Sequence, residues 1–208
     1  MINVKFLILL ITLIISTILS LYIFSKEAEK DKSFNSDTNI KVLNRGEDRI
    51  TLKPGYEKIG NLQARKVDSW SRETPSSSMR VAQYKLDYVR GNGQLVVFSG
   101  IGGSPDENIQ RWYKQFKSES SLPIAETSSN WEIVASQLEI KFVYFEGTFM
   151  KSDMRMNSVT EELKDYALLA AIISGANEPY YFKMTGPSSL IKSQKSLFES
   201  FIQSIQKL

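Results

Sequence analysis

Few residue types that could do chemistry are present in this chain. It has 208 residues but neither cysteine nor histidine, which excludes thiol redox chemistry, imidazole catalysis and the usual ligands of zinc, haem and iron–sulfur clusters. A metal ion would find only oxygen ligands. Serine, lysine, aspartate and glutamate remain, but a Ser-His pair is impossible and no nucleophile-elbow sequence occurs. We therefore predict no catalytic residue, no cofactor and no metal site.

Two sets of acidic residues come closest to a chemical site. The first lies in a polar stretch and could offer oxygen ligands to Ca²⁺: Asp153, Glu161, Glu162 and Asp165. Their spacing fits no known calcium loop. The second lies on expected strands and could supply the carboxylate pair of a glycosidase: Glu132, Glu139 and Glu146. Acids on the solvent side of a sheet show the same pattern, so we assign neither set a site.

A glycine-rich segment precedes the first predicted helix of the domain. Gly100-Ile101-Gly102-Gly103 superficially resembles a phosphate-binding loop, and the amino terminus of a helix attracts anions. The Walker Lys-Ser/Thr pair is absent, however, and Pro105 occupies the last position of a Gly-x-Gly-x-x-Gly motif. We expect a simple turn. Ser104 and Glu107 then form a capping box around Pro105, so a helix should begin here.

The predicted helix has one apolar face that should pack on a sheet. Its members recur at positions i, i+3, i+4 and i+7: Ile109, Trp112, Tyr113 and Phe116. Basic residues lie on the opposite side and should point outward: Arg111, Lys114 and Lys117. We interpret the aromatic face as core packing.

Strands are expected before this helix. The segment MRVAQYKLDY alternates, with Ala82, Tyr84, Leu86 and Tyr88 on one side. Glycines at positions 91 and 93 separate it from QLVVFSGI, so the two runs should form a β-hairpin. The opening segment of the domain reads as short apolar runs at Arg49 to Leu52 and Arg65 to Trp70, split by turns at Pro54-Gly55 and Gly60-Asn61.

More strands and a last helix are expected after it. WEIVASQLEIKFVYFEGTFM should be two strands broken near Ser136-Gln137, with apolar groups on both faces. Residues Lys151 to Asp165 read as a polar loop. YALLAAIIS, residues 166–174, should be a buried central strand that pairs with Pro179 to Thr185. From about Ser189 a helix should bury the following side chains: Leu190, Leu197, Phe198, Phe201, Ile202 and Ile205.

The amino-terminal region predicts a membrane anchor. Phe6 to Phe24 is a run of 19 uncharged residues, about 28 Å long as a helix and close to the thickness of a bilayer's hydrocarbon core. The alternative is a cleaved signal peptide, but the apolar run is long and continues into FSKEAEKD without a small-x-small site. The short tail before the span and the large domain after it favour an extracytoplasmic (periplasmic or external) domain. Protease digestion of intact cells tests that orientation.

Two further features belong to this region. Thr12, Ser16 and Ser20 recur every four residues, a stripe that allows two membrane helices to approach closely, or simply hydroxyls tolerated in a lone span. Residues 26–44 are polar and should form a flexible linker. The expected organisation is an anchor at 1–25, the linker at 26–44 and a soluble α/β domain at 45–208.

The order of strands and helices predicts an α+β fold, a mostly antiparallel sheet covered by helices on both sides. Strand pairs around one internal helix, followed by YYFKMTGP and a terminal helix that contains Phe198 and Phe201, resemble the PsbP/Mog1-like α/β/α sandwich over Trp70 to Gln206. The resemblance implies a scaffold or accessory role without catalysis. It transfers no functional residue.

Two functional interpretations remain open. From Lys26 onward the chain has 25 basic and 23 acidic residues, and the basic ones are spread along the chain. Nucleic-acid binding is therefore not indicated. In the favoured interpretation the domain is a membrane-tethered, non-catalytic interaction or assembly module with a protein partner. In the alternative a cleft between sheet and helix binds a small apolar or anionic ligand, or hosts a hydrolase with oxygen ligands. A pocket lined by converging polar groups would favour the ligand, and a large exposed apolar patch the partner.

Overall fold

A computed structural model describes residues 51–89, 91–153 and 158–208 of the chain. The predicted span Phe6 to Phe24, its hydroxyl stripe and the linker at 26–44 lie outside these residues. Within the described ranges no helix is long and apolar enough to cross a membrane. The anchor therefore stays a prediction from the sequence. From Leu52 onward the chain forms one compact unit.

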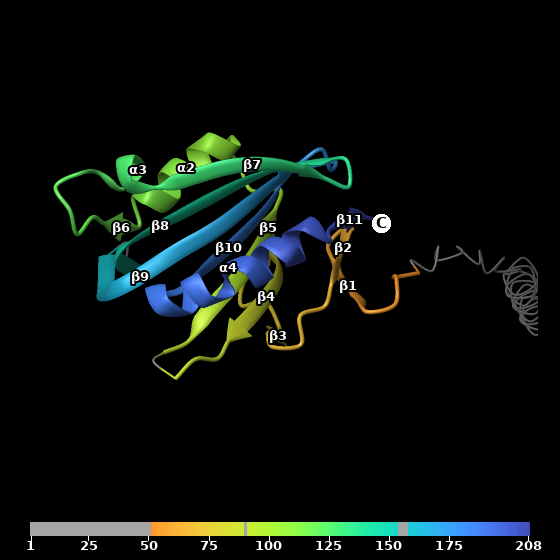
Figure 1. Cartoon of the computed structure of the whole chain (residues 1–208), viewed down its shortest axis with the longest axis horizontal. Coiled ribbons are helices and arrows are strands. Elements are labelled where there is room, and N and C mark those ends of the chain that lie inside the picture. The colour runs from red at the N-terminus through yellow and green to blue at the C-terminus, as the bar shows by residue number, and fades with distance from the viewer. Residues whose placement is uncertain (1–50, 90, 154–157) are drawn as a thin grey trace, which may run out of the picture. The chain divides into compact units, whose positions relative to one another are not determined.

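Strands dominate this unit, and Figure 1 labels them. In chain order the elements are β1 (Tyr56–Ile59), β2 (Leu62–Arg65), β3 (Ser71–Glu73), β4 (Arg80–Leu86), β5 (Gly93–Ser99), α2 (Pro105–Tyr113), β6 (Phe116–Lys117), α3 (Ile124–Thr127), β7 (Ser129–Ala135), β8 (Leu138–Asp153), β9 (Ser158–Ser174), β10 (Tyr180–Pro187), α4 (Ser188–Gln203) and β11 (Gln206–Lys207).

The described strands form one large sheet and one small one. The large sheet has the order β3-β4-β5-β10-β9-β8-β6, and β7 also pairs with β8. Every pairing in it is antiparallel, as expected. Because β8 has 16 residues, its outer edge accommodates both β7 and β6. The hairpin predicted at Gly91 to Gly93 and the pairing predicted between residues 166–174 and 179–185 are confirmed. The break predicted near Ser136-Gln137 is the turn of a further hairpin, between β7 and β8.

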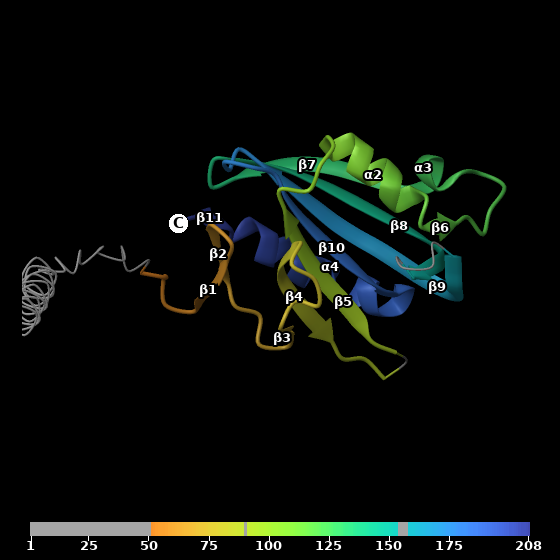
Figure 2. The same ribbon diagram turned by 180° about the vertical axis from the view of Figure 1, so that it is seen from behind.

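Each face of the large sheet has its own hydrophobic core. The helix α4 covers one face, hereafter the α4 face, where Phe182 and Phe142 are fully buried against Phe198. The opposite face, the α2 face, packs Val143 and Phe145 against α2 and α3. Figures 1 and 2 view the sheet from its two sides, with α4 in front of the strands in the first and behind them in the second. The expected sandwich of helices around an antiparallel sheet is thus observed.

The predicted loop at Lys151 to Asp165 is wrong for most of its length. Residues 151–153 continue β8 and residues 158–165 begin β9, with Lys151 opposite Glu161. The Nζ atom of Lys151 lies 3.1 Å from the Glu161 carboxylate, and Thr160 donates a hydrogen bond to the Lys151 carbonyl. This end of the hairpin is exposed, so its strands carry no apolar alternation that a sequence pattern could detect.

The opening segment also differs from the prediction. Its turns are correct, but the prediction gave no strands, whereas β1 and β2 flank Gly60-Asn61. The first predicted apolar run, Arg49 to Leu52, begins outside the described residues. These strands join β11 in the small sheet β1-β2-β11, where Gln206 lies opposite Gln63. A pairing between segments so far apart in sequence leaves no local signal.

The helices are shorter than their apolar patterns suggested. The helix α2 ends at Tyr113, so Phe116 lies on β6 and not on the helix, and it is buried there. In α4, Leu197 is 37% exposed, whereas Ile191, seven residues before Phe198 and on the same side of the helix, is buried. Ile205 is buried but lies beyond the end of α4. The remaining predicted core residues of α4 are buried.

Gly147 is required by close packing of β6 on β8. A Cβ atom at this position would lie 2.6 Å from the Lys117 carbonyl oxygen and 3.2 Å from Cδ1 of Ile124. We expect Gly147→Ala to lower the free energy of unfolding by about 1–3 kcal/mol through overpacking, measured by urea denaturation. Gly102→Ala is the matched control, since a Cβ there meets no atom within 4 Å; equal effects of the two substitutions would contradict the packing argument.

Candidate functional site

The helix α2 covers only part of its face of the sheet. It has nine residues, which is about 14 Å of helix, and its buried side chains Ile109 and Trp112 pack mainly over β8, β9 and Tyr181. The rest of the face, toward β4 and β5, lies beside a cavity of about 690 Å³. Pockets that hold small ligands have volumes in this range. We refer to it as the Lys183 cavity.

Lys183 is one of the residues that line this cavity. It occupies the middle of β10, opposite Val96 on β5 and Ala170 on β9, both of which are buried. Its Nζ atom donates a hydrogen bond to Oε1 of Gln115. Gln115 is itself held in place, because its carbonyl oxygen accepts a 2.8 Å hydrogen bond from the Met150 amide. A lysine at this position of a sheet loses much of its hydration without gaining an anionic partner.

Arg80 and Arg111 also line the cavity and bind only neutral groups. Nη1 of Arg80 donates to Oε1 of Gln83 at 2.7 Å and to Oγ of Ser76 at 2.9 Å. Nη1 of Arg111 donates to the Gly102 carbonyl at 2.8 Å and to Oδ1 of Asn108 at 3.1 Å. Among the described residues, none of the three cations has a carboxylate within 4 Å.

The balance of charge in the lining is strongly positive. The cationic side chains come from β4, α2, β8 and β10: Arg80, Lys85, Arg111, Lys151 and Lys183. Glu73 is the one carboxylate among the described lining residues, and it accepts a hydrogen bond from Gln83. Lys85 and Lys151 are paired with acids outside the cavity, Asp87 and Glu161. An anion in the cavity would meet three cations that have no carboxylate partner.

Burial lowers the pKa of the Lys183 ammonium to about 8, and the nearby positive charge of Arg80 contributes in the same direction. Burial also lowers the pKa of Arg80. Both shifts have the sign expected for cations that lack a counter-ion. Two like charges close together lower the stability of the folded protein. Groups with shifted pKa values are often found at functional sites.

Aromatic rings lie beside the cations. Nζ of Lys183 is 5.8 Å from the centre of the Phe149 ring, and Cζ of Arg80 is 6.0 Å from that of Phe98. Trp112 lines the cavity where α2 ends and packs edge-on against Tyr181. The cavity therefore combines charged groups with apolar surface.

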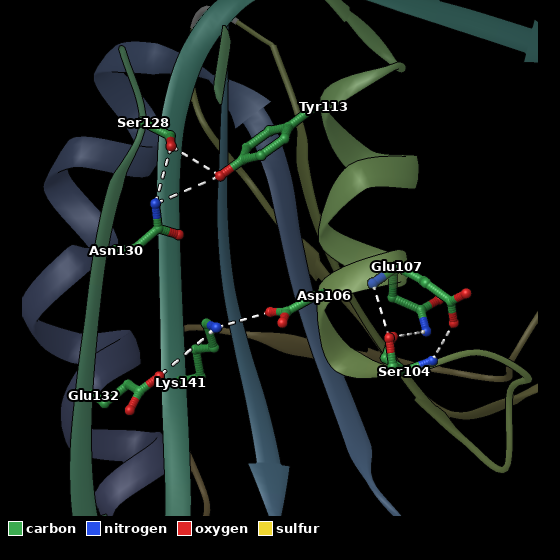
Figure 3. Close-up of polar contacts among 9 residues, drawn as sticks. Ser104, Asp106, Glu107, Tyr113, Ser128, Asn130, Glu132 and Lys141 are labelled. Carbon is green, nitrogen blue, oxygen red and sulfur yellow. Dashed lines mark hydrogen bonds and ion pairs between the residues drawn. The ribbon is translucent and has the colours of Figure 1, made fainter. Parts of the chain in front are cut away.

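Polar contacts fix α2 beside the cavity (Figure 3). Glu107 donates its amide to Oγ of Ser104 at 3.2 Å, and the Ser104 amide donates to the Glu107 carboxylate at 2.6 Å, which is the predicted capping box. Lys141 on β8 bridges Asp106 at 2.8 Å and Glu132 at 3.7 Å. At the other end of α2, Tyr113 shares a 2.8 Å hydrogen bond with Ser128.

The glycine-rich segment is a turn, as expected. Gly100 and Gly103 have φ angles of +64° and +94°, which glycine adopts without strain. The carbonyls of Gly102 and Gly103 accept hydrogen bonds from Asn108 and Arg111. Since the first amides of α2 are engaged by the capping box, the segment contributes to the cavity through Ile101 and through the position of Arg111.

The acidic residues considered for glycoside chemistry do not come together as one group. Glu132 lies opposite Lys141 on the α2 face, and Glu139 lies on that face because it is two residues from Lys141 on the same strand. Glu146 lies on the α4 face, where Tyr144 and Lys192 bind its carboxylate at 2.6 and 2.9 Å. Burial raises the pKa of Glu146, but those two hydrogen bonds outweigh it and leave the pKa below its ordinary value.

The acidic set considered for Ca²⁺ is dispersed as well. Glu161 pairs with Lys151, and its neighbour Glu162 points to the opposite face of β9. Asp165 has a φ of +55° at an irregularity of the β8–β9 ladder. The side chain of Asp153 lies outside the description. In the parts of the chain that the structure describes, no group of three or more acidic residues is arranged to hold a metal ion.

Sequence reasoning missed two kinds of residue. Ser-x-x-Lys occurs at Ser189 to Lys192 and Ser204 to Lys207, but Lys192 binds Glu146 and the Ser204 hydroxyl donates to the Phe201 carbonyl. The second kind is the cations of the cavity. The alternation in YYFKMT contains the signal for Lys183, since Phe182 and Met184 share one face of β10 and Lys183 must lie on the other.

The comparisons with known proteins concern the fold. No family model matches the chain, and no curated protein is significantly similar to it. The chain is similar to the solution structure of cyanobacterial PsbP from Synechocystis sp. PCC 6803, with a TM-score of 0.43 and 10% identity over 71% of this chain and 87% of that one. This likeness transfers no property of that protein to this chain. It assigns no site residue.

Lys183 should titrate well below an ordinary lysine. We expect NMR of the chain labelled with ¹³Cε-lysine to show one signal, absent in Lys183→Met, that titrates near pH 8. Arg80→Gln should raise that pKa, because it removes a like charge, whereas Arg65→Gln, at the exposed last position of β2, should leave it unchanged. The groups that face Lys183 from neighbouring elements are Arg80, Lys85, Arg111, Lys151, Glu73 and Tyr166.

The lowered pKa of Lys183 should also make the free energy of unfolding depend on pH. Because the folded chain releases the Lys183 proton before the unfolded chain does, stability should rise between about pH 8 and the ordinary lysine value of 10.5. Lys183→Met should remove this rise. A titration near 10.5, or equal pH profiles for both proteins, would contradict the assignment.

Proposed function

We propose that the chain is a membrane-tethered, non-catalytic binding module that recognises an anionic group in the Lys183 cavity. The observation that carries the proposal is the placement of Lys183 and Arg80 beside one cavity with no carboxylate of the described residues within 4 Å of either, and with Arg111 at the same cavity. Structural ion pairs would explain cations at such positions, but the described residues provide none. Lys183 and Arg80 are half-buried, and a partly desolvated charge without an ionic partner lowers stability, so its presence favours a role in binding.

The surroundings of Lys183 favour binding over catalysis. A lysine with a lowered pKa can act as a nucleophile toward carbonyl compounds, but such chemistry also needs a general acid or base nearby. Glu73, the described carboxylate of the lining, is already hydrogen-bonded to Gln83. Gln115, the direct partner of Lys183, is neutral and transfers no proton. Turnover of a carbonyl substrate by the purified chain would overturn this part of the proposal.

The geometry favours a ligand-sized group over a broad protein surface. Among the described residues, the large exposed apolar side chains lie on separate elements or loops: Met79, Val89, Leu122, Val134, Val159, Leu197 and Leu208. A concave cationic surface, by contrast, selects for charge and shape. The protein partner favoured by the sequence stays a prediction, and the anionic group that we propose could be part of such a partner.

The predicted anchor would keep the domain close to a membrane. If the predicted linker of 19 residues, 26–44, is flexible, its root-mean-square length would be about 25 Å. The domain would therefore sample molecules at or near the bilayer surface. With the domain outside the cytoplasm, those molecules are components of the extracytoplasmic leaflet or of the adjacent compartment.

Site-specific photo-crosslinking in native membranes tests the binding surface. We expect a photoreactive residue at Met79, which is 52% exposed and lines the cavity, to give adducts that Lys183→Met abolishes. The matched control is Leu197, which is 37% exposed on α4 and faces away from the cavity. No adduct at Met79 under any condition, or equal adducts at both positions, would overturn the proposed function.

Membrane attachment is tested by fractionation. The full chain should remain in the membrane pellet after carbonate washing, while a chain that lacks residues 1–25 should be soluble, because the apolar run is then absent. Protease added to intact cells should digest the domain if it faces outward. A soluble full chain that begins beyond Lys26 would instead identify the apolar run as a cleaved signal peptide.

A further inference from the structure

We propose that the ligand of the Lys183 cavity is a small amphiphilic anion, with a phosphate or carboxylate head bound by Lys183 and Arg80 and an apolar body bound by the neighbouring aromatic rings. This inference rests on the proposed function, since it names the class of molecule that the binding module takes. It adds two requirements, a negative head and an apolar body, that are tested separately below.

The head site is formed by donors that the fold leaves unused. An ammonium group has three donors and a guanidinium group has five. Within the described residues, Lys183 donates only to Gln115, and Arg80 and Arg111 donate only through Nη1. Arg80 is close enough to Lys183 to disturb its titration. An anion between these two groups would relieve their repulsion and gain charge-assisted hydrogen bonds.

The body site is apolar and adjoins the head site directly. The rings of Phe149 and Phe98 lie beside Lys183 and Arg80. Other apolar side chains extend the lining from the glycine-rich turn, α2, β5 and β9: Ile101, Trp112, Val96, Leu163 and Tyr166. A bare inorganic anion would leave this surface in contact with water. An anion with an apolar body would cover it and gain the corresponding free energy of burial.

The location of Lys183 also argues for a small ligand over an acidic peptide. Its side chain is half-buried and arises from a central strand between β5 and β9. Acidic side chains on a protein surface reach exposed lysines such as Lys114 and Lys117 more readily. A cation at the floor of a cavity selects a group that can enter it.

The experiment measures binding to the full chain in phosphatidylcholine nanodiscs, with empty nanodiscs as the blank, by isothermal titration calorimetry. The probes are octyl phosphate, octanoate, octanol, inorganic phosphate and a hexaglutamate peptide. We expect one site for octyl phosphate or octanoate, and the stronger of the two identifies the head group. Octanol and inorganic phosphate should each bind at least tenfold more weakly, because each lacks one of the two parts.

Matched substitutions locate the site. Lys183→Met should weaken binding of the better probe about tenfold or more, as expected for the loss of a charge-assisted hydrogen bond. Lys195→Met should have no effect, since Lys195 lies on the α4 face over the Trp131 ring. Arg80→Gln provides a second variant if Lys183→Met does not fold, and near-UV circular dichroism verifies the fold of each.

Each outcome decides between the proposals. Equal affinity for octanol and octyl phosphate, or equal affinity for inorganic phosphate and octyl phosphate, overturns the amphiphile. Preference for hexaglutamate overturns it in favour of an acidic partner and leaves the proposed function intact. If no probe binds but the Met79 crosslink persists, this inference fails alone. If neither is observed, both fail.

Discussion

The central strands of the sheet must be covered on both faces, and only one face has a helix long enough to do so. The helix α4, with 16 residues, closes its face over a continuous apolar core. The opposite face has a nine-residue helix that protects β8 and β9 but leaves the β4–β5 side beside a cavity. The binding site that we propose exists because α2 covers its face of the sheet less completely than α4 covers the other.

The side chains on the incompletely covered side of the sheet are not all apolar, as they would be if they served only to be buried. A cavity lined by apolar groups alone would collapse or attract a second apolar surface. Here Lys183 interrupts the apolar row of the central strand, and Arg80 and Arg111 reach the same space from β4 and α2. The bonds to Gln115, Gln83 and Asn108 satisfy these cations with neutral oxygen atoms. Some hydrogen-bond donors of these cations are therefore engaged, but no carboxylate of the described residues forms an ion pair with them. This combination is typical of a site that binds an anion.

Much of the fold could be predicted from local patterns, because its strongest signals are local. The capping box of Ser104 and Glu107, the glycines near position 92 and the apolar run at 166–174 each specify an element without reference to distant residues. The failures have the opposite character. The pairing of β2 with β11 and the exposed end of the β8–β9 hairpin depend on partners or solvent exposure that a linear pattern does not contain.

The candidate site was hidden for a related reason. Lys183, Arg80 and Arg111 lie on three elements and become neighbours only when β4, β5 and β10 pair and α2 docks. Arg80 reaches the α2 face because an irregularity between Arg80 and Ala82 shifts the alternation of β4. That shift cannot be seen in the sequence, where Val81 occupies the position that strict alternation gives to this face. Only the alternation around Lys183 was available in advance.

The rims of the large sheet would matter for this chain if it is tethered to a membrane as we propose. An open strand edge is a template for pairing with another chain, and tethering raises the local concentration at which such pairing occurs. At one rim, β3 is only three residues long and consists of Ser71, Arg72 and Glu73. At the other, the outer edge of β8 is occupied by β7 and β6, with Glu132 in the middle of β7. Short length and charge thus guard the sheet against growth into aggregates.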